Sequence, residues 1–172
     1  IPLKYIYAGL KKARVSGRME VYTNKSKQVI VDYAHNKMSF ETLFQSTKKE
    51  YPNKKITIVF GCPGKKALGR RRELGEIAGK YSDYVYITEE DAGEEPVTKI
   101  CQEIAEHVEK QECTYAIIVD REEAIREAIE NADDNTIVLI TGKGRETRQK
   151  RGTQYIDTPS DVEYVKKYLE IN

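Results

Sequence analysis

Short runs rich in Val, Ile and Tyr recur along the chain, and each is separated from the next by enough residues for one helix. The runs lie at residues 28–33, 56–60, 84–88, 115–120 and 136–141. Continuous apolar runs of this length are typical of strands that are buried on both faces of a parallel sheet. The alternation therefore predicts an α/β domain, in which helices cover both faces of a mostly parallel sheet.

The segments between the runs carry apolar residues three and four positions apart, which is the spacing of an amphipathic helix. These residues are Phe40, Leu43 and Phe44; Leu74, Ile77 and Ala78; Ile100, Ile104 and Val108; and Ala124, Ile125, Ala128 and Ile129. Residues 19–23 and 28–33 flank a polar turn and predict an antiparallel hairpin. Residues 159–169 predict a closing helix with Thr158 as its cap and Pro159 at its first position.

The length and composition favour a single soluble domain. The chain has 172 residues, with 29 Lys and Arg against 28 Asp and Glu, and about 150 residues is the usual size of one domain. The balanced charge argues against a nucleic-acid partner, and no run approaches the roughly 18 apolar residues of a membrane span. Cys62, Cys101 and Cys113 share no metal-ligand spacing, so we expect reduced thiols and a cytoplasmic location.

The ends of the predicted strands hold the residues that could carry chemistry, because ligands of such sheets bind beyond the carboxyl ends of the strands. Asp32, His35 and Asn36 follow the first buried run. Asp32 could hold a ribose hydroxyl or a metal, and His35 could contact phosphate. In the alternative interpretation Asn36 caps the next helix and His35 is an ordinary turn residue.

Two glycine-rich loops follow other strands. Between residues 61 and 80 the chain has six Lys and Arg against two acids, which fits an anion site at a helix N-terminus or a solvated basic face. Gly142 and Gly144 follow the last run and would let the backbone approach a ligand closely. Glu146 then presents a carboxylate, or else belongs to an ordinary flexible loop.

The segment 89–112 is acidic, with nine Asp and Glu against two Lys. Glu94 and Glu95 would stabilise the N-terminus of a helix that begins at Pro96. Glu90 and Asp91 lie nearer the strand end and could attract an ammonium group. The chain contains neither the G-x-x-x-x-G-K-[ST] loop that cradles nucleotide phosphates nor a G-x-G-x-x-G dinucleotide motif after a strand.

Four motifs in order resemble the C-terminal domain of a Mur ligase over essentially the whole chain. They are Gly-Arg-Met-Glu at 17–20, Val-Asp-Tyr-Ala-His-Asn at 31–36, Phe-Gly-Cys-Pro-Gly at 60–64 and Gly-Lys-Gly-Arg-Glu at 142–146. They are most similar to the ligase that adds the third peptide residue to UDP-N-acetylmuramoyl-L-alanyl-D-glutamate. The expected fold is a Rossmann-like three-layer α/β domain with a sheet of about six strands.

The resemblance implies that residues 1–172 are one domain of a three-domain, ATP-dependent, amide-forming enzyme of peptidoglycan synthesis. Residues 2–13 read as the end of a longer element, and the chain does not begin with Met. An N-terminal UDP-substrate domain and a central ATPase domain would precede this one. The central domain would hold most contacts to ATP and Mg²⁺ and would be an intramolecular partner of this chain. We therefore expect the fragment alone to be inactive.

The resemblance also implies roles for particular residues. Those expected to contact ATP are Arg18, Asp32 and His35, and those expected to bind the incoming amino acid are Lys66, Glu90, Asp91, Gly142 and Glu146. It implies no catalytic residue with certainty and no metal ligand in this domain.

The identity of the incoming amino acid rests on a departure from the family pattern. Diaminopimelate-adding members carry Asp-Asn-Pro-Arg in the acidic loop, where this chain has Glu90, Asp91, Ala92 and Gly93. The arginine that fixes the distal carboxylate is missing, which favours L-lysine. A diaminopimelate ligase, a folylpolyglutamate or cyanophycin synthetase, and a non-enzymatic anion-binding module using the loops around Lys66 and Lys143 remain alternatives.

Overall fold

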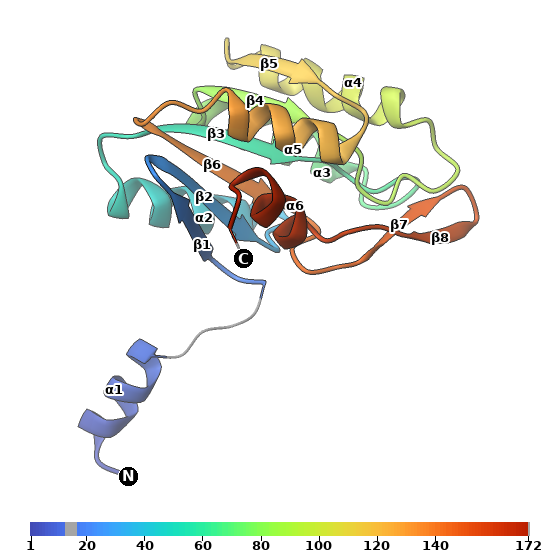
Figure 1. Cartoon of the computed structure of the whole chain (residues 1–172). Helices are drawn as coiled ribbons and strands as arrows, with labels where there is room; N and C mark the ends of the chain where they lie inside the picture. The colour runs from blue at the N-terminus through green and yellow to red at the C-terminus, as the bar shows by residue number, and fades with distance from the viewer. Residues whose placement is uncertain (13–16, 172) are drawn as a thin grey trace.

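A six-stranded sheet forms the centre of the computed structural model, which describes residues 1–12 and 17–171 (Figure 1). The strands are β1 (Glu20–Asn24), β2 (Lys27–Asp32), β3 (Lys55–Phe60), β4 (Tyr84–Ile87), β5 (Thr114–Ile117) and β6 (Thr136–Thr141). Their order is β1-β2-β6-β3-β4-β5. The pair β1 and β2 is the expected antiparallel hairpin, and the other neighbouring pairs are parallel. The predicted three-layer α/β fold is confirmed.

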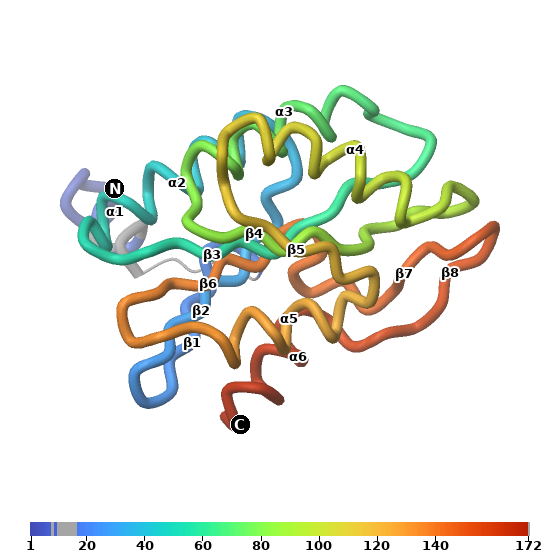
Figure 2. Tube along the Cα trace, turned by 90° about the horizontal axis from the view of Figure 1, so that it is seen from above, coloured from blue at the N-terminus to red at the C-terminus, as the bar shows by residue number. Residues whose placement is uncertain are grey.

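Helices cover the two faces of the sheet in a way that follows from the strand order. On one face lie α2 (Lys37–Glu50), α3 (Gly69–Tyr81) and α4 (Val97–Glu109); on the other lie α5 (Arg121–Glu130) and α6 (Asp161–Tyr168) (Figure 2). The chain moves outward from β2 through β3 and β4 to β5, and then returns to β6. Because parallel crossovers are right-handed, the outward and returning connections fall on opposite faces.

Each face has its own core. Phe40 and Phe60 pack edge to face, with ring centroids 5.2 Å apart, beneath α2. Val59, Ile125 and Val165 lie in the opposite core and are fully buried. Burying one such side chain stabilises the fold by about 1.5–3 kcal/mol. These two cores fix the strand ends, and with them the loops that carry the predicted site.

Three local expectations are corrected. The closing helix begins at Asp161, and its cap is Ser160, whose hydroxyl accepts from the Glu163 amide, rather than Thr158. The run 115–120 is not a strand buried on both faces: β5 ends at Ile117, lies at the sheet edge and is half-exposed. A second hairpin, β7 (Arg148–Arg151) and β8 (Gln154–Asp157), was not predicted, because its short strands are mostly polar and exposed.

Helix α1 (Leu3–Lys12) stands apart from the sheet in Figure 1, and its Leu3 and Tyr7 side chains are exposed. It covers most of the segment 2–13 that reads as the end of an element; residue 13 lies outside the described residues. Within the described part of the chain, no helix is long and apolar enough to cross a membrane.

Candidate functional site

The loops that follow β2, β3, β4 and β6 meet at the carboxyl edge of the sheet. Gly61 and Gly64 allow the loops after β3 and β4 to touch through their backbones. A Cβ at Gly61 would lie 2.4 Å from the Thr88 carbonyl oxygen, and one at Gly64 would lie 1.8 Å from that of Ala92. The glycine-rich loop therefore has a packing role that any anion-binding role would share.

A cleft of about 180 Å³ lies between these loops. It is lined by Tyr33, His35, Pro63, Lys66, Arg70, Glu90, Asp91, Gly142, Lys143 and Glu146. The structure thus brings together all five residues expected to bind the amino acid and one of the three expected to contact ATP. Arg18 and Asp32 do not line this cleft. They lie beside it, at the end of the β1–β2 hairpin. The register pairs Glu20 with Val31, so Arg18 comes to lie near Tyr33 and Asp32 near Met19.

The β2 end of the cleft is held by backbone contacts. Asp32 accepts hydrogen bonds from the amides of Met19 (2.8 Å) and Ala34 (2.7 Å), so both carboxylate oxygens already have a donor. Met19 has a φ of 46°, in the left-handed region that non-glycine residues rarely adopt. The Arg18 guanidinium is exposed and lies 4.7 Å from the Tyr33 ring centroid.

His35 and Asn36 combine both interpretations of this segment. The Asn36 side chain accepts from the Ser39 amide at 3.0 Å and caps α2, as the structural alternative predicted. His35 nevertheless lines the cleft, with Nδ1 2.7 Å from the Tyr33 carbonyl oxygen. The neutral ring then donates from Nδ1, an assignment made from this contact, which leaves Nε2 available to a ligand.

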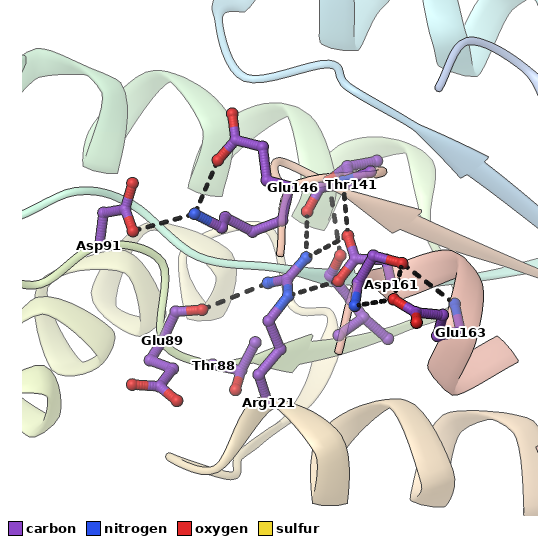
Figure 3. Close-up of polar contacts among 12 residues, drawn as sticks. Thr88, Glu89, Asp91, Arg121, Thr141, Glu146, Asp161 and Glu163 are labelled. Carbon is purple, nitrogen blue, oxygen red and sulfur yellow. Dashed lines mark hydrogen bonds and ion pairs between the residues drawn. The ribbon is translucent and has the colours of Figure 1, made fainter. Parts of the chain in front are cut away.

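A lysine of the chain occupies the position that sequence reasoning gave to a substrate ammonium. The Lys143 Nζ lies 3.0 Å from Asp91 Oδ1 and 2.7 Å from Glu146 Oε2, and Lys143 is buried (Figure 3). Glu146 also accepts from the Tyr33 hydroxyl, and Asp91 accepts from the Lys150 amide at 2.8 Å. Both carboxylates are therefore already paired within the chain.

Glu90 is the exception among the cleft carboxylates. It is buried against Gly142, where a Cβ would lie 2.2 Å from Glu90 Oε2. Among the side chains that the structure describes (residues 1–7, 9 and 17–171), none donates a hydrogen bond to this carboxylate. Burial raises the pKa of Glu90 to about 7, although the positive charges of Arg121 and Lys143 act in the opposite direction. Glu90 is therefore poised to ionise when a cation arrives.

The other wall of the cleft is basic. Lys66 comes from the loop after β3, Arg70 from the first turn of α3, and His35 from the loop after β2. The cleft is therefore lined by basic side chains, here called the cationic wall (Lys66, Arg70 and His35), and by acidic ones, here called the acidic wall (Glu90, Asp91 and Glu146). This combination suits a zwitterion, which carries both a carboxylate and an ammonium group.

Sequence reasoning missed three residues of this site. Arg70 and Lys143 were noted only as members of basic or glycine-rich segments, although their places next to strand ends were a usable signal. Arg121, which is buried behind the cleft, had no signal in the sequence that could have identified it. Its side chain binds Asp161 and the carbonyls of Glu89 and Thr141 (Figure 3).

Among the residues that the structure describes, no three His, Cys, Asp or Glu side chains are grouped in a way that could hold a metal ion.

The fold and cleft define a three-layer α/β domain with a charged cleft where loops converge at the carboxyl edge of its sheet. Residues 17–144 match the family model described as "Mur ligase, glutamate ligase domain". The chain belongs to this family.

Individual relatives agree with the family assignment. The chain is 39% identical over 153 residues to the UDP-N-acetylmuramyl-tripeptide synthetase of Lactobacillus delbrueckii subsp. bulgaricus, covering 88% of the chain and 29% of that protein. It is 36% identical over 170 residues to the UDP-N-acetylmuramoyl-L-alanyl-D-glutamate–L-lysine ligase of Streptococcus thermophilus, covering 97% and 34%.

A solved structure of a UDP-N-acetylmuramoyl-L-alanyl-D-glutamate–2,6-diaminopimelate ligase superposes with a TM-score of 0.82 at 27% identity. The match covers 93% of this chain and 32% of the other. The chain thus spans about a third of the length of the proteins it matches.

Proposed function

We propose that the chain is the amino-acid-accepting, C-terminal domain of a cytoplasmic, ATP-dependent ligase of peptidoglycan synthesis. The ligase would add L-lysine to UDP-N-acetylmuramoyl-L-alanyl-D-glutamate. The observation that carries the proposal is the cleft itself, which residues of three family motifs line together with the side chains of the cationic wall and the acidic wall. Such a cleft suits a free amino acid, whose two ends carry opposite charges.

The two walls suggest how the amino acid is oriented. Lys66 and Arg70 would bind its carboxylate, and Glu90 would be the counter-ion of an ammonium group, because Asp91 and Glu146 are already paired with Lys143. A buried carboxylate without a donor gains most from an arriving cation, since the charge is poorly solvated beforehand. Glu146 and Asp91 could then share their remaining lone pairs with the same ammonium.

ATP would bind at the carboxyl end of β2, beside the amino-acid cleft. ATP supplies the phosphoryl group that activates the D-glutamate carboxylate, and Mg²⁺ would be held mainly by the central domain. The exposed guanidinium of Arg18 fits phosphate oxygens. His35 would donate from Nε2 to a phosphate only as the imidazolium, because the proton of the neutral ring lies on Nδ1 against the Tyr33 carbonyl oxygen. Asp32 fits a ribose hydroxyl only through its remaining lone pairs, because two backbone amides already use its oxygens.

Two preparations test this proposal. The complete ligase that contains this domain is incubated with ATP, Mg²⁺, the UDP-muramoyl dipeptide and L-lysine, and the product is identified by mass spectrometry. We expect an adduct one lysine heavier, with phosphate released in equal amount. The isolated 172-residue chain should produce neither product. Failure of the complete protein to join any amino acid would contradict the proposal.

A further inference from the structure

The buried side chain of Arg121, at the start of α5, is hydrogen-bonded to three separate parts of the chain. Its Nε and Nη2 lie 2.7 and 2.9 Å from the two carboxylate oxygens of Asp161, the first residue of α6. Nη1 donates to the Glu89 carbonyl at 3.2 Å, and Nη2 donates to the Thr141 carbonyl at 2.7 Å. Figure 3 shows this guanidinium between the ends of β4, β6 and α6.

Two of these three contact residues are direct sequence neighbours of residues that line the cleft. Glu89 precedes Glu90, and Thr141 precedes Gly142. Asp161 extends the network further, because its Oδ2 accepts from the Gly144 amide at 2.8 Å. Gly144 itself has a φ of 56° and lies between Lys143 and Glu146 in the loop after β6.

The chemistry of the guanidinium explains why arginine serves here. Its planar fork presents several donors in fixed directions, whereas a lysine ammonium is a point charge that cannot reach the same set of acceptors. Arg121 and Asp161 are both almost completely buried, so water does not substitute for a lost contact. Removing one partner of such a pair leaves a buried charge uncompensated.

We propose that Arg121 is a positioning residue, which holds the backbones after β4 and β6 so that Glu90, Lys143 and Glu146 face the amino-acid cleft. This inference rests on the proposed function for its kinetic consequence. It does not extend to the ATP side, because Asp32 orders that end through the amides of Met19 and Ala34. Replacing Arg121 should therefore weaken binding of the amino acid while binding of ATP stays the same.

The kinetic test compares Arg121→Lys with wild type in the complete ligase. Because small displacements of positioned groups can change rates by up to about a hundredfold, we expect KM for L-lysine to rise about tenfold or more. KM for ATP should stay within about twofold. Asp161→Asn, which keeps the side-chain volume, is the second variant and should act in the same direction.

Ile125→Ala is the matched control, because Ile125 is buried on the same helix but packs in the core rather than at the cleft. It should lower the unfolding midpoint without separating the two KM values. Equal shifts of both KM values in Arg121→Lys and Asp161→Asn would overturn the positioning role. So would a wild-type KM for L-lysine in both variants.

A second measurement separates this inference from the proposed function. In the 172-residue chain alone, amide hydrogen exchange of residues 90–91 and 142–146 should accelerate in Arg121→Lys, while exchange within α2 stays unchanged. If the wild-type ligase joins no amino acid but this exchange pattern is found, the proposed function fails and the structural role stands. Uniform acceleration across the chain would overturn the positioning role whatever the ligase does.

Discussion

The ammonium of Lys143 lies 2.7 Å from a carboxylate oxygen of Glu146, and the same nitrogen lies 3.0 Å from Asp91. One internal cation is therefore paired with two carboxylates at the place where a substrate ammonium was expected, which leaves the three groups with one net negative charge. An incoming ammonium must share these oxygens with Lys143 or bind to Glu90. The number of free negative charges in the cleft is thus smaller than the acidic sequence suggests.

The Lys143–Glu146 pair should be measurable as a coupling. Lys143→Met should destabilise the chain by about 1–3 kcal/mol, because Asp91 and Glu146 lose a charged donor in a partly buried site. A double-mutant cycle with Glu146→Gln, read by urea unfolding at pH 7, should give a coupling of about 1 kcal/mol. The more exposed pair Arg126 and Glu130 serves as control and should couple more weakly, because solvent screens it. Equal couplings in the two pairs would contradict the assignment.

The free energy of unfolding should fall as the pH rises toward the raised pKa of Glu90. Its folded-state pKa of about 7 lies above the ordinary 4.5, so the folded chain binds more protons than the unfolded chain between these values. The stabilisation is complete below pH 4.5 and is lost as pH rises through 7. Relative to wild type, Glu90→Gln should gain about 2–3 kcal/mol of unfolding free energy between pH 5 and 8.

The control for Glu90 is Glu106→Gln, an exposed position on α4. Urea unfolding at intervals across pH 5 to 8 provides the comparison. Parallel curves for wild type and Glu90→Gln would mean that Glu90 does not carry the shifted pKa.

The contribution of Glu20 to stability should depend on pH in the opposite direction from that of Glu90. Hydrogen bonds from Arg145, at 2.7 Å to each carboxylate oxygen, lower the pKa of Glu20 from 4.5 to about 2. The stabilisation is present above pH 4.5 and lost as pH falls toward 2. Glu20→Gln should cost about 1–2 kcal/mol at pH 7, less than the full shift because Arg145 is half-exposed, and nearly nothing at pH 2. A cost that does not depend on pH would exclude the ion pair as its cause.

The convergence of the site could be predicted from sequence, because strands with parallel neighbours bring their carboxyl ends to one edge of the sheet. That rule alone placed His35, Glu90 and Gly142 together. It does not say which charges pair with each other. Lys143 lies within the Gly-Lys-Gly-Arg-Glu motif at 142–146, yet its partners could be known only from the positions of the loops.

Arg121 could not be identified from the sequence. Its partners Asp161 and Glu89 lie 40 and 32 residues away along the chain, and a buried arginine leaves no periodic pattern. The hairpin of β7 and β8 was not predicted for a related reason, because its strands are short and mostly exposed. Gly152, with a φ of 60° at the turn, was the one local signal.

Arg18 and Asp32 should differ in how they affect the complete ligase. Arg18 is exposed and contacts mainly the Tyr33 ring, so Arg18→Ala should raise KM for ATP by the loss of a phosphate contact of about 1.5–3 kcal/mol while the unfolding midpoint stays near wild type. Asp32→Ala should raise KM for ATP and also destabilise the fold, because two backbone amides lose their acceptor. Unchanged ATP kinetics in both variants would show that this strand end does not serve the nucleotide.

The choice of amino acid gives the last prediction. L-lysine and meso-diaminopimelate share one amino-acid end and a distal ammonium, but only diaminopimelate has a distal carboxylate. Lys66 and Arg70 are the basic side chains of the cationic wall besides His35, and the first carboxylate of either substrate would occupy them. The second carboxylate would then face Glu90 and Asp91, whose negative charges would repel it.

An unmatched buried charge costs several kcal/mol, so a site of this kind rejects diaminopimelate more strongly than it favours lysine. We expect a preference for L-lysine of at least about tenfold in kcat/KM, which corresponds to roughly 1.4 kcal/mol. Glu146→Gln and Glu90→Gln should both reduce it, Glu90→Gln more, since Glu146 is already paired with Lys143. A competition assay with both amino acids at equal concentration measures the preference directly. A product dominated by the diaminopimelate adduct would refute the substrate assignment and leave the ligase assignment intact.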